Sequence, residues 1–293
     1  MMELLRLIPA NEDCDFVLII SLDCFAIKRR KKLCKKAITS PVTGGGNLNQ
    51  AKRKDHNMKL YKVPDYNSAC RKATGLIAAQ IQFKPNSVIA WPTGSTPIGV
   101  YEKLAALYER GELDFSEITS FNLDEYCGIA DTDPQSYHYF MNEQLFSKVN
   151  TNKDRQFFPD QNAADIEQAC KDYEEKIASC GGLDFVFLGI GTNGHIGFNE
   201  PAPVFSTSTH CVALDEKTIA DNARFFERLE DVPREALTMG IKTIMLAKKI
   251  ILVASGPAKR EIMQKALYGP ITPEVPGSIL QVHHDVTVIW SEN

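Results

Sequence analysis

The loop from Gly191 to Glu200 carries the residue types best suited to acid–base chemistry. It reads Gly-Thr-Asn-Gly-His-Ile-Gly-Phe-Asn-Glu and follows an apolar run. His195 titrates near neutral pH and can move protons, and Glu200 can hold its imidazole in one tautomer and raise its basicity. A single loop histidine is more often structural than catalytic. A histidine and a carboxylate in one glycine-rich loop after an apolar run nevertheless favour a catalytic site.

A second candidate for proton transfer is Asp124, which stands with Glu125 directly after the apolar run at 118–123. A carboxylate in this position can act as a base. Two adjacent carboxylates can take different roles if their environments separate their pKa values. The alternative is a helix cap or a surface turn, and the pattern alone leaves both interpretations open.

The segment at 92–97, Pro-Thr-Gly-Ser-Thr-Pro, lies between a strand-like run and a helix-like one. Glycine lets the backbone approach a ligand, and hydroxyl and amide groups at a helix N-terminus bind anions such as phosphate. No Gly-Lys-Ser/Thr follows, so this is not a Walker A loop. The alternative is a simple turn with a helix cap. The candidate phosphate-binding residues here are Thr93, Gly94, Ser95 and Thr96.

Two cations further along the chain are candidates to bind the same anion. Arg224 offers bidentate geometry to a phosphate group. Lys259 lies in the first turn of a predicted helix that follows an apolar run. The alternative for each residue is a solvated cation on the protein surface.

The cysteines and the paired histidines form no recognisable metal or redox motif. None of the eight cysteines has a partner at C-x-x-C spacing, and we interpret them as free thiols in a reducing compartment, the cytoplasm. His283 and His284 have no Cys or carboxylate at ligand spacing, so no metal site is expected.

From Met58 onward, short apolar runs alternate with amphipathic segments, which predicts an α/β fold. The predicted strands are 87–91, 118–123, 183–190, 249–255 and 285–290, and the predicted helices are 98–108, 137–149, 163–179 and 258–267. We expect an open, mostly parallel, Rossmann-like sheet with helices on both faces, forming a single catalytic domain. Because ligands bind outside the carboxyl ends of parallel strands, the four polar loops should converge on one edge.

The charge distribution suggests a boundary near Met58. Residues 1–57 carry a balance of +5, whereas the remaining residues carry −9. We interpret 1–57 as a basic extension, disordered or outside the real domain, with a basic arm for an anionic surface as the alternative. The domain then spans 58–293. The polar, weakly periodic segment 204–231 is predicted to be a mobile lid that brings Arg224 to the ligand.

Composition excludes several classes of protein. Hydrophobic residues make up 44% and charged residues 24% of the 293-residue chain, which is ordinary for a globular protein and rules out a collagen or a wholly disordered chain. No apolar run reaches eighteen residues, so no membrane span is expected. A net charge of −4 is unfavourable for a dedicated nucleic-acid binder.

Four blocks, taken together, resemble the glucosamine-6-phosphate deaminase (glucosamine/galactosamine-6-phosphate isomerase) family over about residues 58–291. The blocks are Pro-Thr-Gly-Ser-Thr-Pro at 92–97, Phe-Asn-Leu-Asp-Glu-Tyr at 121–126, the loop at 191–201 and Ala-Arg-Phe-Phe at 223–226. The resemblance implies conversion of D-glucosamine 6-phosphate and water to D-fructose 6-phosphate and ammonia, in amino-sugar catabolism, without a cofactor. The extension has no counterpart in the family pattern.

The resemblance also implies a role for each residue. Asp124 matches the base that removes the C2 proton and delivers it to C1 through an enediol-like species, and His195 matches the acid/base group that opens the sugar ring at O5. Asn193 and Glu200 match the partners of the imidazole. Ser95, Thr96, Arg224 and Lys259 match phosphate-binding positions, with Lys259 aligned to within one residue.

Two departures from the family pattern bear on activity and regulation. Position 193 is Asn where many members carry Asp, which suggests a lower pKa for the ring-opening group. The stretch 201–213 lacks the Arg and Lys of the effector site in allosteric members, and the chain ends soon after Trp290. We therefore expect a short, non-allosteric enzyme, a monomer or low-order homo-oligomer.

Two other kinds of sugar-phosphate protein share part of this pattern. A 6-phosphogluconolactonase shares a glycine-rich loop with a histidine, but its loop lacks the Phe-Asn-Glu-Pro run at 198–201 and its reaction needs no carbon base at 124. A sugar-phosphate-sensing regulator would need a DNA-binding segment, and residues 1–57 do not have the pattern of one. It would also have no reason to keep both Asp124 and His195.

Overall fold

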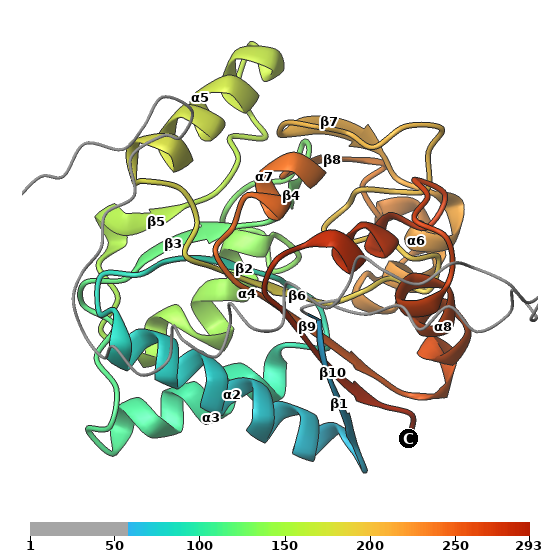
Figure 1. The fold of residues 1–293 in the computed structure, drawn as a ribbon. Coiled ribbons are helices and arrows are strands. Elements are labelled where there is room, and N and C mark those ends of the chain that lie inside the picture. Colours follow the sequence, from blue (N-terminus) through green and yellow to red (C-terminus); the bar gives the residue numbers. More distant parts are fainter. Residues whose placement is uncertain (1–57) are drawn as a thin grey trace, which may run out of the picture. The chain divides into compact units, whose positions relative to one another are not determined.

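A computed structural model describes residues 58–293 (Figure 1), and the predictions made for 1–57 lie outside these described residues. Seven parallel strands form the large sheet in the order β1-β10-β9-β6-β2-β3-β5. This arrangement confirms the predicted parallel sheet. The strands are β1 (Lys59–Val63), β2 (Val88–Trp91), β3 (Thr119–Asn122), β5 (Gln156–Phe157), β6 (Phe185–Leu188), β9 (Ile250–Ser255) and β10 (Val286–Ser291).

Helices cover both faces of the large sheet, as the sequence predicts. Alternate strand residues enter different cores: Ala90 packs in one core, whereas Ile89 and Trp91 pack in the other. One face carries α2 (Tyr66–Phe83), α3 (Ile98–Glu109) and α4 (Tyr137–Gln144), and the other carries α5 (Ile166–Ser179), α7 (Ile241–Met245) and α8 (Arg260–Tyr268). Burial on both faces explains why the central strands are continuous apolar runs.

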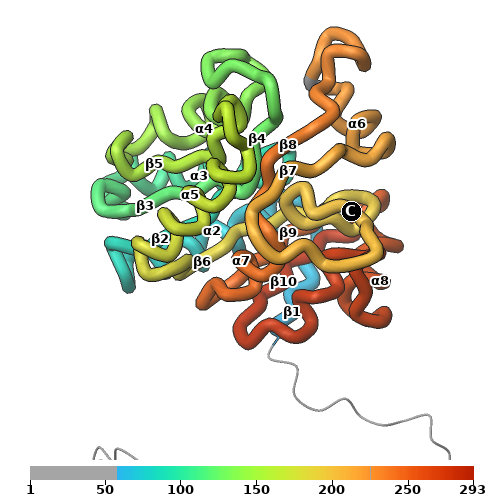
Figure 2. Tube along the Cα trace, turned by 90° about the horizontal axis from the view of Figure 1, so that it is seen from above, coloured from blue at the N-terminus to red at the C-terminus, as the bar shows by residue number. Residues whose placement is uncertain are grey.

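A second, antiparallel sheet was not predicted. It joins β4 (Asp124–Tyr126), β8 (Glu235–Thr238) and β7 (His210–Ala213), with β8 in the middle. Figure 2 shows these strands together, with α6 (Glu216–Asn222) beside them. Asp124 therefore does not end a parallel strand, because β3 stops at Asn122 and the chain turns into β4. Only the pairing with β8, over a hundred residues away, makes this segment a strand.

Several helix boundaries differ from the predictions for local reasons. The segment 137–149 is helical only to Gln144 and ends in the 3₁₀ turn Phe146–Lys148. Helix α5 begins at Ile166, because the carboxylate of Asp165 accepts the backbone N–H of Gln168 at 3.0 Å and caps it. The described helices include none that is both long and apolar enough to cross a membrane.

The predicted lid, 204–231, contains regular structure. It includes β7, α6 and two short 3₁₀ turns, Ala223–Phe225 and Leu229–Asp231. On one side the segment is joined to the core, since the backbone N–H of Thr209 donates to Glu174 of α5 at 2.7 Å. Its movement remains a prediction.

Candidate active site

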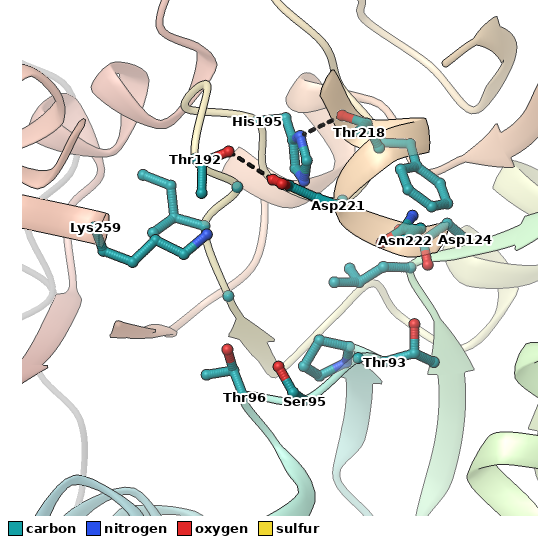
Figure 3. A pocket seen from close by; sticks show the side chains of 18 of the residues that line it. Thr93, Ser95, Thr96, Asp124, Thr192, His195, Thr218, Asp221, Asn222 and Lys259 are labelled. Atoms are coloured by element: carbon teal, nitrogen blue, oxygen red, sulfur yellow. Dashed lines mark hydrogen bonds between the residues drawn. The ribbon is translucent and has the colours of Figure 1, made fainter. Parts of the chain in front are cut away.

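A pocket of about 410 Å³ opens at the carboxyl ends of the parallel strands (Figure 3). The loops after β2, β3, β6 and β9 all line it, so the expected convergence of the four polar loops is confirmed. Of the predicted site residues, the pocket is lined by Thr93, Gly94, Ser95, Thr96, Asp124, His195, Arg224 and Lys259. Asn193 and Glu200 are not in this lining and lie behind the imidazole of His195.

Asp124 has an almost completely buried carboxyl group at the wall of the pocket. Its residue is 6% exposed, and among the described residues no group hydrogen-bonds its carboxylate. Burial, followed by the negative charge of Glu125, raises the pKa of Asp124 from 3.8 to about 8. With this pKa the group favours its protonated form at pH 7, and a cationic ligand beside it would favour the carboxylate.

His195 is held from behind by a carboxylate that is itself fixed. The Nδ1 atom of His195 lies 3.4 Å from Oε2 of Glu200 and 3.4 Å from Oγ1 of Thr218. Thr218 donates to Oε1 of Glu200 at 2.6 Å, and the Asn193 amide donates to Oε2 at 2.6 Å. With Nδ1 directed at this network, Nε2 is the ring nitrogen left for a ligand.

The Glu200 carboxylate remains charged in spite of its burial. Burial acts to raise its pKa, but the hydrogen bond and charge of His195, then the hydrogen bonds from Thr218 and Asn193, outweigh burial and lower the pKa below its usual value. A charged Glu200 stabilises the imidazolium form of His195. The network can therefore support a histidine that gains and releases a proton during a reaction.

Gly191 allows the imidazole to lie directly against the backbone. A Cβ atom at this position would stand 2.3 Å from Cε1 of His195, far inside contact distance. The backbone N–H of Gly191 also donates to the carbonyl of His195 at 2.9 Å, which closes the loop. Any side chain at 191 would displace the imidazole.

The other end of the pocket suits an anion. Gly94 adopts φ 88°, a conformation that favours glycine, and turns the loop between β2 and α3. Arg224 donates to Oγ of Ser95 at 3.3 Å. In Figure 3, Lys259 lies on the opposite side of the pocket from Asp124.

Lys259 combines partial burial with neighbouring charges. Burial lowers its pKa to about 8; Asp221 opposes this shift, while Arg224 and Lys217 add to it. A bound phosphate would add negative charge beside this lysine and favour its charged form. This end of the pocket therefore combines two cations and several hydroxyl groups, a donor set suited to phosphate.

Helix α6 supplies residues that the sequence reasoning missed. Thr218, Asp221 and Asn222 all line the pocket (Figure 3). Asp221 accepts a hydrogen bond from Thr192 at 2.7 Å, and Asn222 donates to the hydroxyl of Tyr126 at 2.9 Å. Asp215 caps α6 by accepting the N–H of Lys217, and this cap was the sequence pattern that could have located the helix.

Comparison with known proteins identifies the family. The sequence model described as glucosamine-6-phosphate isomerases/6-phosphogluconolactonase matches residues 66–290. The chain belongs to this family. The match spans all four sequence blocks on which the predicted resemblance rests, and it covers the strands whose loops line the pocket.

Relatives within the glucosamine-6-phosphate isomerase/6-phosphogluconolactonase family include several named deaminases. The chain is 52% identical over 232 residues to the glucosamine-6-phosphate deaminase of Lachnoclostridium phytofermentans, covering 79% of this chain and 98% of the relative. It is 50% identical over 232 residues to the one of Clostridium acetobutylicum, covering 79% and 96%.

Two solved structures of the family compare differently with this chain. A monomeric glucosamine-6-phosphate deaminase is similar with a TM-score of 0.78 and 43% identity, covering 80% of this chain and 97% of that one. The 6-phosphogluconolactonase of Thermotoga maritima reaches a TM-score of 0.61 at 20% identity, covering 80% and 100%. The second likeness shows only that the fold is shared.

Histidines and cysteines outside the pocket have structural surroundings in this family member. Nε2 of His283 lies 2.8 Å from the carbonyl of Ala247, so this ring is tied to the backbone. Within residues 58–293, no group of three or more His, Cys, Asp or Glu side chains is arranged to hold a metal ion. The cysteines in this part of the chain are free thiols, namely Cys70, Cys127, Cys170, Cys180 and Cys211.

Proposed function

We propose that this protein is a glucosamine-6-phosphate deaminase. It converts D-glucosamine 6-phosphate and water to D-fructose 6-phosphate and ammonia, a step in amino-sugar catabolism. The observation that carries the proposal is one pocket lined by a buried carboxyl group, Asp124, by a carboxylate-supported imidazole, His195, and by two cations. The relatives that are about half identical over nearly their whole length bear the same name.

His195 performs the first step, the opening of the sugar ring. The pyranose opens when the anomeric hydroxyl loses a proton and the ring oxygen O5 gains one. The imidazole can carry out this exchange, because Glu200 stabilises its protonated form and Thr218 and Asn193 hold Glu200 in place. Such general acid–base assistance typically contributes about 10²–10⁴-fold to the rate.

Asp124 performs the second step, which moves a proton between two carbons. Its carboxylate removes the proton from C2 of the open-chain amino aldehyde while the aldehyde oxygen O1 gains a proton, which gives an enolamine. Asp124 then returns its proton to C1 and the nitrogen loses one proton, which leaves an imine at C2 and a hydroxyl group at C1. Water then adds to C2, and ammonia leaves to give the ketose. The substrate ammonium group is attached to C2, so it lies next to Asp124 and favours the ionised, basic form of a carboxyl group that burial keeps protonated in the empty pocket.

The phosphate group positions the reacting carbons without taking part in the chemistry. Ser95, Thr96, Arg224 and Lys259 bind it, and Thr93 and Gly94 shape the loop. Binding energy obtained at this remote group holds C1 and C2 at Asp124. Neither a metal nor a cofactor enters these steps.

Residues 204–231 act as a lid in this proposal. The segment contains Arg224, whose guanidinium would move onto the phosphate, and α6, which carries Thr218 to the imidazole network. Limited proteolysis with and without the substrate tests this role. Protection of the segment by ligand is expected, and identical cleavage in both states would show that the segment does not close.

Assembly, regulation and location complete the proposal. We infer a monomer or low-order oligomer, by analogy with the similar monomeric deaminase, and a cytoplasmic location, which suits the free thiols. The absence of Arg and Lys in 201–213 supports a non-allosteric enzyme. Sigmoidal kinetics relieved by N-acetylglucosamine 6-phosphate would contradict this regulation, and sedimentation analysis tests the assembly.

A direct assay separates the deaminase from the lactonase alternative. The full chain is incubated with D-glucosamine 6-phosphate, and ammonia and fructose 6-phosphate are measured; hydrolysis of 6-phosphogluconolactone is followed in parallel. Ammonia release without lactone hydrolysis is expected, because lactone hydrolysis leaves no role for a carbon base at Asp124. Lactone hydrolysis without ammonia release would overturn the proposal.

A further inference from the structure

Glu125 is a completely buried carboxylate beside the proposed base. Its side chain is 0% exposed, and it does not line the pocket. Adjacent side chains of a strand point to opposite faces, so on β4 Asp124 faces the pocket while Glu125 faces α4. The two carboxyl groups are thus neighbours in sequence but have separate surroundings.

The carboxylate of Glu125 is fixed at the start of α4. Oε1 accepts the backbone N–H of Tyr137 at 3.0 Å and that of Tyr126 at 2.8 Å. Oε2 accepts the backbone N–H of His138 and lies 2.9 Å from its ring Nδ1. These contacts join β4, which carries Asp124, to the first turn of α4.

His138 connects this buried carboxylate to solvent. The imidazole stacks on Phe158 with ring centroids 3.7 Å apart, and its side chain is 27% exposed. Its Nδ1 also lies 3.7 Å from a carboxylate oxygen of Asp131. The ring N–H at Nδ1 donates to Glu125 and so compensates part of the negative charge behind Asp124.

We propose that Glu125 and His138 form a positioning pair that holds β4 and sets the electrostatic field around Asp124. The proposal rests on the proposed function, in which Asp124 is the base. Neither residue touches the pocket, so both act through Asp124.

The charges around Asp124 support this assignment. After burial, the charge of Glu125 is what raises the pKa of Asp124, although His195, Asp221, Arg224 and Lys259 line the same pocket. The phenols on which the charge of Asp124 acts add no charge of their own at neutral pH, and burial raises the pKa of each one further. These phenols belong to Tyr101, Tyr126, Tyr137 and Tyr173.

The proposed roles of Glu125 and His138 lead to opposite predictions for the pH dependence of ammonia release. Removing the charge of Glu125 should make Asp124 a weaker base that ionises at lower pH. Removing the His138 ring should leave more of the negative charge of Glu125 uncompensated, so that Asp124 ionises at higher pH. A purely structural role would not move the pH dependence in two directions.

The experiment measures kcat/KM for ammonia release from pH 5 to 10 with the full chain. For Glu125→Gln, the acidic limb of the kcat/KM profile should move to lower pH by about one unit, and the plateau value of kcat/KM should fall about threefold. For His138→Phe, which keeps the stacking and leaves Glu125 its three backbone donors, the limb should move up. Glu143→Gln, on an exposed position of the same helix, is the matched control and should leave the limb unmoved.

Each outcome decides the proposal. Unmoved limbs in both folded variants, or shifts in the same direction, would overturn it. If circular dichroism shows that Glu125→Gln does not fold, the His138→Phe limb decides alone. Titration of the Asp124 carboxyl ¹³C resonance repeats the test without turnover. Failure of the proposed function would instead appear as no ammonia release from the unaltered protein, whatever the carboxyl titration shows.

Discussion

The substitution Asp124→Asn tests the proposed base and the stability of the fold separately, because burial of this carboxyl group is costly for folding. The pKa of Asp124 rises from 3.8 to about 8 on burial beside Glu125. The folded chain therefore binds a proton that the unfolded chain releases, and stability falls as pH rises from about 4 to about 8. Asparagine does not titrate in this pH range, so the substitution removes this pH-dependent loss of stability.

The magnitude follows from the linkage relation. At pH 7 the shift corresponds to roughly 4 kcal/mol of lost stability relative to acid pH, as an upper bound. Burying the asparagine amide also costs hydration, which offsets part of this difference. We therefore expect Asp124→Asn to raise the free energy of unfolding at pH 7 by about 1–3 kcal/mol. For a domain of this size each kcal/mol corresponds to about 2–4 °C in Tm.

The assay is thermal unfolding of parent and variant from pH 4.5 to 9. The difference in Tm should be close to zero at pH 4.5 and should grow toward pH 8. Glu102→Gln removes the same charge from an exposed position on α3 and serves as the control, with no pH-dependent difference expected. A variant that is less stable than the parent at every pH would refute the reasoning about burial.

Activity provides the second half of this prediction. Asp124→Asn should abolish ammonia release while substrate binding, measured by calorimetry, stays nearly intact. The phosphate end of the pocket, which supplies most of the charged contacts, is unchanged by the substitution. Turnover at the parent's rate would show that Asp124 is not the base.

Three further predictions address the imidazole and the phosphate end. Gly191→Ala should lower kcat at least about 100-fold without unfolding the protein, because the added Cβ would displace His195. Steady-state kinetics and circular dichroism check this prediction, and full activity would contradict it. Glu200→Gln should lower kcat with little change in KM, because the imidazole of His195 loses the charged partner behind its Nδ1; steady-state kinetics check this, and an unchanged kcat would contradict it. Because the pKa of Lys259 is about 8, KM should rise above that pH as the lysine loses its charge. Lys259→Gln should have a high KM that does not rise further with pH.

The large sheet could be predicted well from the sequence. Its central strands are buried on both faces, so they appear as continuous apolar runs such as 185–188 and 250–255, and the helices between them keep the 3.6-residue period. The edge strand β1 was not predicted, because its residues are mostly exposed and carry no apolar pattern.

The small sheet and α6 could not be predicted from local sequence patterns. Strand β4 has three residues and exists only because β8 pairs with it in the register Asp124↔Thr238. Helix α6 is seven residues long, below the length at which a period can be recognised. Its pocket residues Thr218 and Asp221 were missed for this reason.

The sequence by itself determined the chemical groups, namely a carboxylate at 124, an imidazole at 195 and the loop around Ser95, and it located the ends of β2 and β6 that carry the last two. It did so because residue type and strand polarity are local properties. Only the tertiary structure decided the burial that raises the pKa of Asp124 and the support of His195 by Glu200 and Thr218. Burial and the distances between charges depend on which distant segments pack together.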